Sequence, residues 1–294
     1  MSVTIPIGRR LRRSLIDPAL PTPSPVLHRC YRVTYLIAGL LAIAAAGGLL
    51  FGAYRDNLWV SSQLRGQDFV SLLFALPLLL LSARFARRGS VGGHLAWLGT
   101  LGYITYSYLY IFAIAWNRLF LVYLTLLSLS AFTLVRALIA TDADSIASKF
   151  DSNTPVKAVS RYLMIFAIGI SVLWGVQAVA ATFSGDIPQS VLDSGHPTGV
   201  VFVLDLGLVV PLFFIGARML RRREPWGFVG AGILLVKGIT EGLALLGMSL
   251  FMYLDDYPDM DVALVPLWAI VTIASLGLSI PFFRSIAPRQ EEYR

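Results

Sequence analysis

Eight apolar stretches, each long enough to cross a bilayer as a helix, constrain the fold of this chain more than any other feature of its sequence. A transmembrane helix needs about 20 consecutive, mainly apolar residues, and only short polar segments separate these stretches. They lie at residues 33–54, 69–86, 95–116, 119–140, 162–183, 199–218, 228–250 and 263–283. The sequence therefore predicts an all-α integral membrane protein with eight transmembrane helices.

The composition excludes a soluble globular fold. Of the 294 residues, 56% are hydrophobic and only 14% are charged, whereas soluble domains carry about 25% charged residues. The single cysteine, Cys30, can form neither an intramolecular disulfide nor a cysteine metal cluster. The three histidines, at positions 28, 94 and 196, are expected at membrane edges or in loops, so no pair can ligate a haem inside the bundle. We therefore expect neither a cofactor nor a metal.

The basic residues predict the orientation of the chain in the cell membrane. Of the 24 lysines and arginines, all but Arg55, Arg65, Arg118 and Lys237 lie before the first stretch or near the inner ends of later ones. Short cytoplasmic segments are enriched in basic residues, so we expect a multi-pass protein with both termini cytoplasmic. The basic face suits anionic lipid, and a nucleic-acid partner is not expected because such a face belongs to a soluble domain. The acidic outer loops contain Asp186, Asp193, Asp255, Asp256, Asp259 and Asp261.

The chain also contains an internal repeat. Three residue pairs recur at a constant offset of 134 residues: Pro77-Leu78, Ala83-Arg84 and Arg87-Arg88 return as Pro211-Leu212, Ala217-Arg218 and Arg221-Arg222. This predicts two four-helix halves of the same orientation, an arrangement found in transporters. The alternative is that a proline-kinked helix ending in arginines is a common inner-membrane pattern.

The repeat and the loops divide the chain into five parts. Residues 1–30 form a basic cytoplasmic tail, 31–140 the first repeat, 141–160 a cytoplasmic loop with room for a short surface helix, 161–284 the second repeat, and 285–294 a cytoplasmic tail. The matched prolines, Pro77 and Pro211, lie inside predicted spans, where each removes a backbone hydrogen bond and kinks its helix. Matched interruptions in two halves point to a site at the centre.

Asp205, Lys237 and Glu241 are the ionisable residues that lie well inside the predicted spans. Charges within a bilayer are costly, so they should face the protein interior or a water-filled cavity. The rise per helical residue places Asp205 and Glu241 at one depth in the outer half, with Lys237 one turn deeper on the stripe of Glu241. In one interpretation Lys237 is the counter-ion of a cation or proton site. In the other, the cluster is a buried polar contact retained for packing specificity.

The third stretch contributes a hydroxyl-rich aromatic face. Tyr103, Tyr106 and Tyr110 share one side of the predicted helix, and Ser107 lies beside them. The repeat alignment sets this stretch opposite the seventh, so these side chains are expected to line a polar cavity facing the charges. The alternative is an aromatic belt and ordinary core. Asp68 opens the second stretch and is interpreted as an acidic residue favoured at a helix N-terminus, or as part of an outer vestibule.

These patterns favour a small-solute transporter coupled to protons or a monovalent cation through the carboxylates. One alternative is a non-catalytic accessory or sensor subunit that binds a membrane protein partner or a lipid. Another is an intramembrane enzyme acting on a lipid or isoprenoid, although the chain carries none of the common catalytic or nucleotide-binding motifs. Transport predicts a hydrated cavity that reaches Glu241, whereas a subunit predicts a long apolar groove; a homo-oligomer is compatible with either.

Overall fold

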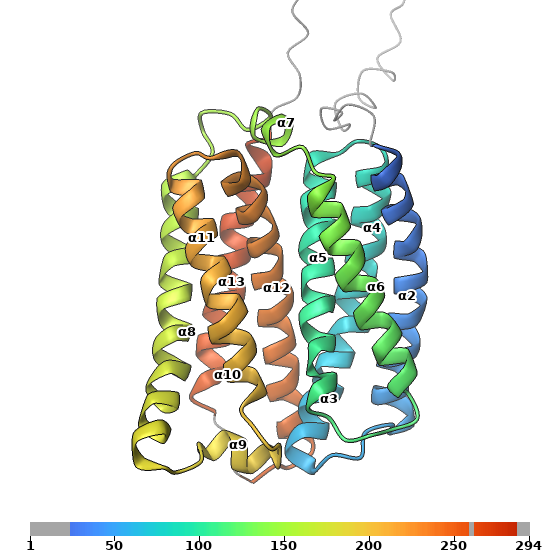
Figure 1. Ribbon diagram of the computed structural model, residues 1–294, viewed down its shortest axis with the longest axis vertical. Coiled ribbons are helices and arrows are strands. Elements are labelled where there is room, and N and C mark those ends of the chain that lie inside the picture. The colour runs from blue at the N-terminus through green and yellow to red at the C-terminus, as the bar shows by residue number, and fades with distance from the viewer. Residues whose placement is uncertain (1–23, 259–261, 287–294) are drawn as a thin grey trace, which may run out of the picture.

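The computed structural model describes residues 24–258 and 262–286, and within these ranges the chain folds into a bundle of long helices (Figure 1). The only extended pairing among these residues is an isolated bridge between Phe150 and Ile286. The helices are α2 (Pro25–Phe51), α3 (Leu58–Val70), α4 (Leu76–Arg87), α5 (Val91–Leu109), α6 (Phe120–Ile139), α7 (Ala143–Ala147), α8 (Val156–Ser184), α9 (Gln189–Ser194), α10 (Val200–Leu204), α11 (Val210–Arg221), α12 (Pro225–Leu254) and α13 (Leu264–Arg284).

Seven of the described helical segments are long and apolar enough to cross a membrane, so the chain is an all-α, multi-pass membrane protein in a lipid bilayer. Two of these segments are continuous runs through a π-helical turn: α3, η1 (Ser71–Ala75) and α4 form one, and α10, η3 (Asp205–Val209) and α11 form the other. Each of the eight predicted stretches is largely helical, and the short helix expected between residues 141 and 160 is present as α7.

Helix α5 is less apolar than the seven but runs beside them through the bundle (Figure 1). It packs against α4, α6 and α12, and 12 of its 19 residues are buried. A helix shielded from lipid by its neighbours needs little apolar surface, which explains why hydropathy alone separates α5 from the rest.

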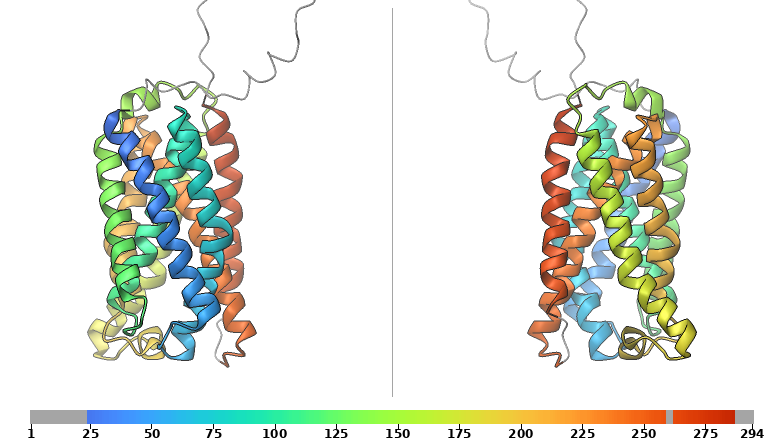
Figure 2. Two further views of the ribbon diagram at one scale, coloured as in Figure 1. Left: turned by 90° about the vertical axis from the view of Figure 1, so that its right-hand side faces the viewer. Right: turned by 90° about the vertical axis from the view of Figure 1, so that its left-hand side faces the viewer.

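The helices form two groups that meet where α5 lies next to α12. Figures 1 and 2 show α2, α4, α5 and α6 in one group and α8, α11, α12 and α13 in the other. Short helix α7 marks one end of the bundle and α9 the opposite end, and both described chain ends lie at the α7 end (Figure 1). The groups are also joined by α3, which crosses α12 so closely that Gly66 and Gly247 touch through their backbones.

Both predicted proline irregularities coincide with π-helical turns. The Leu76 N–H donates to the Ser71 carbonyl, and the Val210 N–H donates to the Asp205 carbonyl, each reaching back five residues rather than four. The prolines themselves, Pro77 and Pro211, are the next residues along the chain. Because a proline ring crowds the preceding helical turn, a widened turn directly before it lets the helix continue.

The two proline-containing helices also end alike, at positions separated by the same offset. Gly89 and Arg223 both adopt the left-handed conformation, with φ of 88° and 56°. Just beyond these turns, Gly93 and Gly227 approach the backbone of the preceding helix, where an added Cβ would lie 2.8 and 2.3 Å from a backbone nitrogen. Such contacts require glycine, and they set α4 against α5 and α11 against α12 in the same way.

A chain of buried hydrogen bonds fastens α2 to α5 near the α7 end. The Tyr31 hydroxyl lies 2.8 Å from Nδ1 of His94, and Nε2 of His94 lies 2.9 Å from Oγ1 of Thr141. The indole N–H of Trp97 donates to Oγ1 of Thr34. Since each of these polar groups has a partner, the cluster is a structural contact.

Two sequence-based boundaries were wrong. The second span begins at Leu58 rather than at residue 69, because the polar residues of α3 are buried against α12 and do not face lipid. Asp68 is therefore in the third turn of a helix, and its interpretation as a helix N-terminal residue is wrong: it is 3% exposed, and Oδ2 accepts a hydrogen bond from Tyr54. Gly48 provides the space for this carboxylate.

The ends of the chain differ from the expected division in one respect. Helix α2 begins at Pro25, inside the segment 1–30 that was expected to be a tail. The rest of that tail, residues 1–23, lies outside the described residues, as do residues 287–294 of the C-terminal tail and the outer-loop residues Asp259 and Asp261.

Candidate functional site

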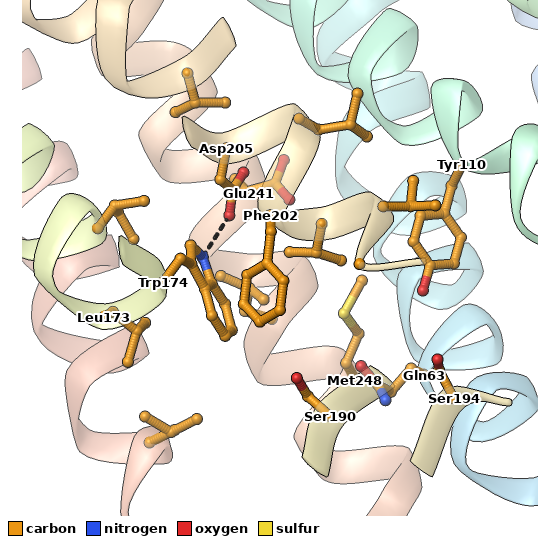
Figure 3. Close-up of a pocket in the computed structure, with 18 of the residues that line it drawn as sticks. Gln63, Tyr110, Leu173, Trp174, Ser190, Ser194, Phe202, Asp205, Glu241 and Met248 are labelled. Atoms are coloured by element: carbon orange, nitrogen blue, oxygen red, sulfur yellow. Dashed lines mark hydrogen bonds between the residues drawn. The ribbon is translucent and has the colours of Figure 1, made fainter. Parts of the chain in front are cut away.

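Asp205 begins the π-helical turn η3 and is held from two sides. Its Oδ1 accepts a hydrogen bond from the Tyr106 hydroxyl of α5 at 2.5 Å, and its Oδ2 accepts one from the indole N–H of Trp174 of α8 at 2.7 Å (Figure 3). Both donors are neutral groups. The Asp205 carboxylate is thus oriented by the protein without an ion pair of its own.

Lys237 and Glu241 form an ion pair one helical turn apart on α12. Lys237 Nζ lies 3.0 Å from Glu241 Oε2, and the two side chains are 13% and 19% exposed. The same ammonium lies 3.8 Å from the centroid of the Tyr106 ring, a cation–π distance. Tyr106 therefore joins the charges, since its hydroxyl contacts Asp205 and its ring face contacts Lys237.

These residues line a cavity of about 690 Å³ on the α9 side of the second helix group (Figure 3). The volume lies in the range of about 300–1,000 Å³ that is typical of small-molecule sites. The wall between α8 and α13 is mainly apolar, and residues from α3, α5, α9 and α10 complete the enclosure. Its carboxylates are those of Asp193, Asp205 and Glu241, and its one ammonium is that of Lys237.

Most of the residues expected at a site meet around this cavity. Tyr106, Ser107 and Tyr110 line it together with Asp205, Lys237 and Glu241. The hydroxyl of Ser107 is buried without a hydrogen-bond partner among the described residues. Tyr110 lies nearer the α9 end, where its ring meets His196 edge to face at 5.5 Å.

Tyr103 is the exception among the tyrosines that were expected to line the cavity. It is fully buried and does not line it. Its hydroxyl lies 3.0 Å from Oγ of Ser71, the first residue of η1. Helical rotation explains the difference, because Tyr103 faces α3 and α4 while Tyr106 and Tyr110 face the second helix group.

Several lining residues were missed by sequence reasoning. Gln63 and Gln67 line the cavity from α3, and Gln177 and Trp174 line it from α8. The two glutamines of α3 are four residues apart and so share a helix face, a signal that was lost when the second span was started at residue 69. Gln177 is a polar residue inside an apolar span and was an available signal. Nothing in the sequence pairs Trp174 with Asp205.

The α7 side of the cavity is closed by packed aromatic side chains. Phe213, which is 1% exposed, forms part of its wall. The rings of Phe213 and Phe166 are 4.4 Å apart, and Tyr162 bonds across from α8 to Ser275 of α13 at 2.5 Å. Nearer the α7 end, Phe150 packs with its ring centroid 4.9 Å from that of Phe282. The cavity therefore ends inside the bundle.

At the α9 end, loops and the short helix α9 border the cavity. The amide of Asn57 donates to the Asp193 carbonyl at 2.8 Å, which ties α9 to α3. Burial lowers the pKa of His196, which follows α9, and the nearby Asp56 charge opposes this effect. Arg65 is paired with Asp255 at 2.9 Å, so the one arginine of α3 is already neutralised.

Comparison of the chain with protein-family models, with curated proteins and with solved structures finds no match. The fold and the cavity define a class, a polytopic helical membrane protein with a polar site inside the bundle.

Proposed function

We propose that this protein transports a small solute across a membrane, coupled to protons or a monovalent cation through Asp205 and Glu241, with Lys237 as the internal counter-ion. The observation that carries the proposal is the cavity that reaches these three residues from the α9 side and stops at the packed rings around Phe213. A site that is open toward one end and closed toward the other is one of the two end states of alternating access.

The proposed topology has eight spans, with α5 as the eighth. Its 19 residues correspond to a length of about 28 Å at 1.5 Å per residue, close to the hydrocarbon thickness of about 30 Å. The α7 end is cytoplasmic in this proposal, because the arginines at the ends of α4, α6, α11 and α13 gather there. Anionic lipid is then the expected contact of this face.

The proposed halves are parallel repeats related by the offset of 134 residues. The offset pairs η1 with η3, the left-handed Gly89 with Arg223, and the close approach at Gly93 with that at Gly227. These agreements concern backbone geometry and are independent of the sequence identities that suggested the repeat. They favour a true repeat over two unrelated helices that each contain a proline.

The proposed repeat also explains why only one half carries charges. Ser71 and Tyr103 correspond to Asp205 and Lys237, and Ser107 corresponds to Glu241. Ser71 and Tyr103 contact each other directly, so the first half has a neutral polar contact where the second has charged groups. The accessory-subunit alternative predicts a long apolar groove without a polar floor, and the charged residues at the cavity favour transport over it.

Alternating access can be tested without knowing the solute. In a Cys30→Ser background we would place one cysteine at Gln177, which lines the cavity, or at Ser279, which is buried in the α13 face nearer the α7 end. Each would be exposed in sealed vesicles to a membrane-impermeant thiol reagent on one side at a time. Ser130→Cys, at a fully buried serine of α6, is the matched control and should stay unreactive.

Transport predicts that the cysteine at position 177 reacts from the α9 side and that at position 279 reacts, more slowly, from the α7 side. Asp205→Asn should change the two rates in opposite directions, because it alters the balance between two states. If the cysteine at position 279 never reacts from the α7 side and Asp205→Asn leaves the rate at position 177 unchanged, the cavity is a fixed binding pocket and the transport proposal is wrong.

A further inference from the structure

The charge around the cavity is negative, which limits the ligands that can bind there. Its lining residues include the three carboxylates of Asp193, Asp205 and Glu241 and one ammonium, that of Lys237. That ammonium is already engaged by Glu241 at 3.0 Å and by the Tyr106 ring. An anionic ligand would have to separate this pair and leave a carboxylate uncompensated in a poorly solvated site, which is strongly unfavourable.

The contact point for a cation is on Glu241. Both oxygens of Asp205 already accept hydrogen bonds, from Tyr106 and Trp174. Among the described residues only Lys237 hydrogen-bonds to Glu241, and it does so through Oε2. Oε1 of Glu241 is therefore left to accept a hydrogen bond from a ligand.

The walls suit an organic cation better than a bare metal ion. Aromatic rings bind ammonium groups through their faces, and the cavity is lined by Trp59, Tyr106, Tyr110, Trp174, Phe202 and Trp268. Trp174 and Phe202 pack edge to face, 5.0 Å apart, directly beside Asp205. An alkali ion needs several oxygen ligands at once, and here both oxygens of one of the two deep carboxylates are occupied by N–H and O–H donors.

The rest of the cavity requires an apolar body on that cation. Leu173 of α8, Leu245 and Met248 of α12, and Leu264 of α13 line the space between the charged floor and the α9 end (Figure 3 shows two of them, Leu173 and Met248). These side chains offer no hydrogen bonds, so they favour hydrocarbon or aromatic groups.

We infer that the cavity binds an organic ammonium ion with an apolar body, with its nitrogen at Glu241 and its body between α8 and α13. That this ammonium is the transported solute rests on the proposed function. A proton on Glu241 removes the charge that holds the ammonium, so proton and ammonium exclude each other at one carboxylate. Exchange of one for the other across the membrane conserves charge and provides the coupling.

Binding would be measured on the full-length protein in phosphatidylcholine nanodiscs, with empty nanodiscs as the reference for partition into lipid. Three probes share one apolar body and differ in the head group: 4-phenylbutylamine, 4-phenylbutan-1-ol and 4-phenylbutanoate. Trp59, Trp174 and Trp268 line the cavity, so tryptophan fluorescence reports on binding, and calorimetry provides an independent value.

We expect saturable binding of the amine at least tenfold tighter than that of the alcohol, about 1.4 kcal/mol, and no saturable binding of the carboxylate. Glu241→Gln should reduce the amine to the affinity of the alcohol while leaving the alcohol unchanged, which also establishes that the variant is folded. Asp68→Asn, a buried carboxylate outside the cavity, is the matched control and should retain the preference for the amine.

Equal binding of all three probes, preferential binding of the carboxylate, or an amine preference that survives Glu241→Gln would overturn the inference. The wild-type comparison needs no variant, so a failure of Glu241→Gln to fold leaves the test intact. Amine binding without thiol access from the α7 side would contradict transport alone. Thiol access from both sides without an amine preference would contradict only the ligand assigned here.

Discussion

The crossing of α3 and α12 at Gly66 and Gly247 offers a direct test of the packing around the cavity. A Cβ added at Gly66 would lie 2.3 Å from the Gly247 carbonyl oxygen and 2.6 Å from the Met248 Cα. Both are backbone atoms of a long helix and cannot turn aside as a side chain can. Gly66→Ala must therefore push the two helices apart by about 1 Å to reach ordinary contact distance.

The expected cost follows from this geometry. Overpacking a well-filled interface costs about 1–3 kcal/mol, and the rigid backbone contact places Gly66→Ala in the upper part of that range. The matched control is Gly39→Ala in α2, where nothing lies within 4 Å of the added Cβ. There the methyl group only restricts the unfolded chain, so we expect stabilisation by up to about 1 kcal/mol.

The assay is reversible unfolding of the purified protein in mixed micelles, with thermal stability in detergent as a second measure. Because Gln63 and Gln67 of α3 line the cavity, Gly66→Ala should also shift the fluorescence of the tryptophans around it. If Gly66→Ala and Gly39→Ala agree within about 0.5 kcal/mol, a margin within which distant substitutions ordinarily fall, the close crossing of α3 and α12 is refuted.

Three further predictions concern single side chains. Lys237→Met should destabilise the protein by about 3–5 kcal/mol because it leaves the Glu241 carboxylate unpaired, and adding Glu241→Gln should restore most of that loss in the same unfolding assay. Tyr31→Phe removes the hydroxyl partner of a buried imidazole and should cost about 1–3 kcal/mol, measured by unfolding with wild type as reference. Burial lowers the pKa of His196 below its usual 6.5, against the opposing charge of Asp56, so the packing of this residue is retained at higher pH and weakens as pH falls through 6.5. Amide exchange of residues 189–196 should accordingly increase between pH 8 and pH 5.5 in wild type but not in His196→Asn; a pH-independent rate in wild type would contradict the assignment.

The long apolar segments were predictable because burying the backbone in lipid leaves helices as the solution for a chain of this composition. Hydropathy failed at α3, where Ser62, Gln63, Arg65 and Gln67 give the first half of a long helix a polar composition. These side chains face α12, the cavity and the α9 end, and Arg65 is neutralised by Asp255. A scale that assumes lipid outside every helix cannot find a helix covered by protein, and the misplaced start also led to the wrong interpretation of Asp68.

The candidate site was predictable where it depended on one helix and unpredictable where it depended on helix rotation. Lys237 and Glu241 are four residues apart, so their pairing follows from helix geometry alone. Tyr106 and Tyr103 are three residues apart, yet one lines the cavity and the other faces Ser71. The bond between Trp174 and Asp205 requires the relative rotation of two helices, which packing sets and periodicity does not specify.

The void and the charges occur together because the proposed halves differ at one helix crossing. In the repeat frame the counterpart of α3 against α12 is α10 against α5, and Gly66 corresponds to Val200. A valine at this position cannot allow the backbone contact that Gly66 makes with Gly247. The cavity lies between α10 and α5, lined by Val200 on one side and Tyr110 on the other. Charged side chains need such a space, since dense apolar packing around them would leave them unsolvated, so an open crossing in the second half and a charged floor beneath it depend on each other.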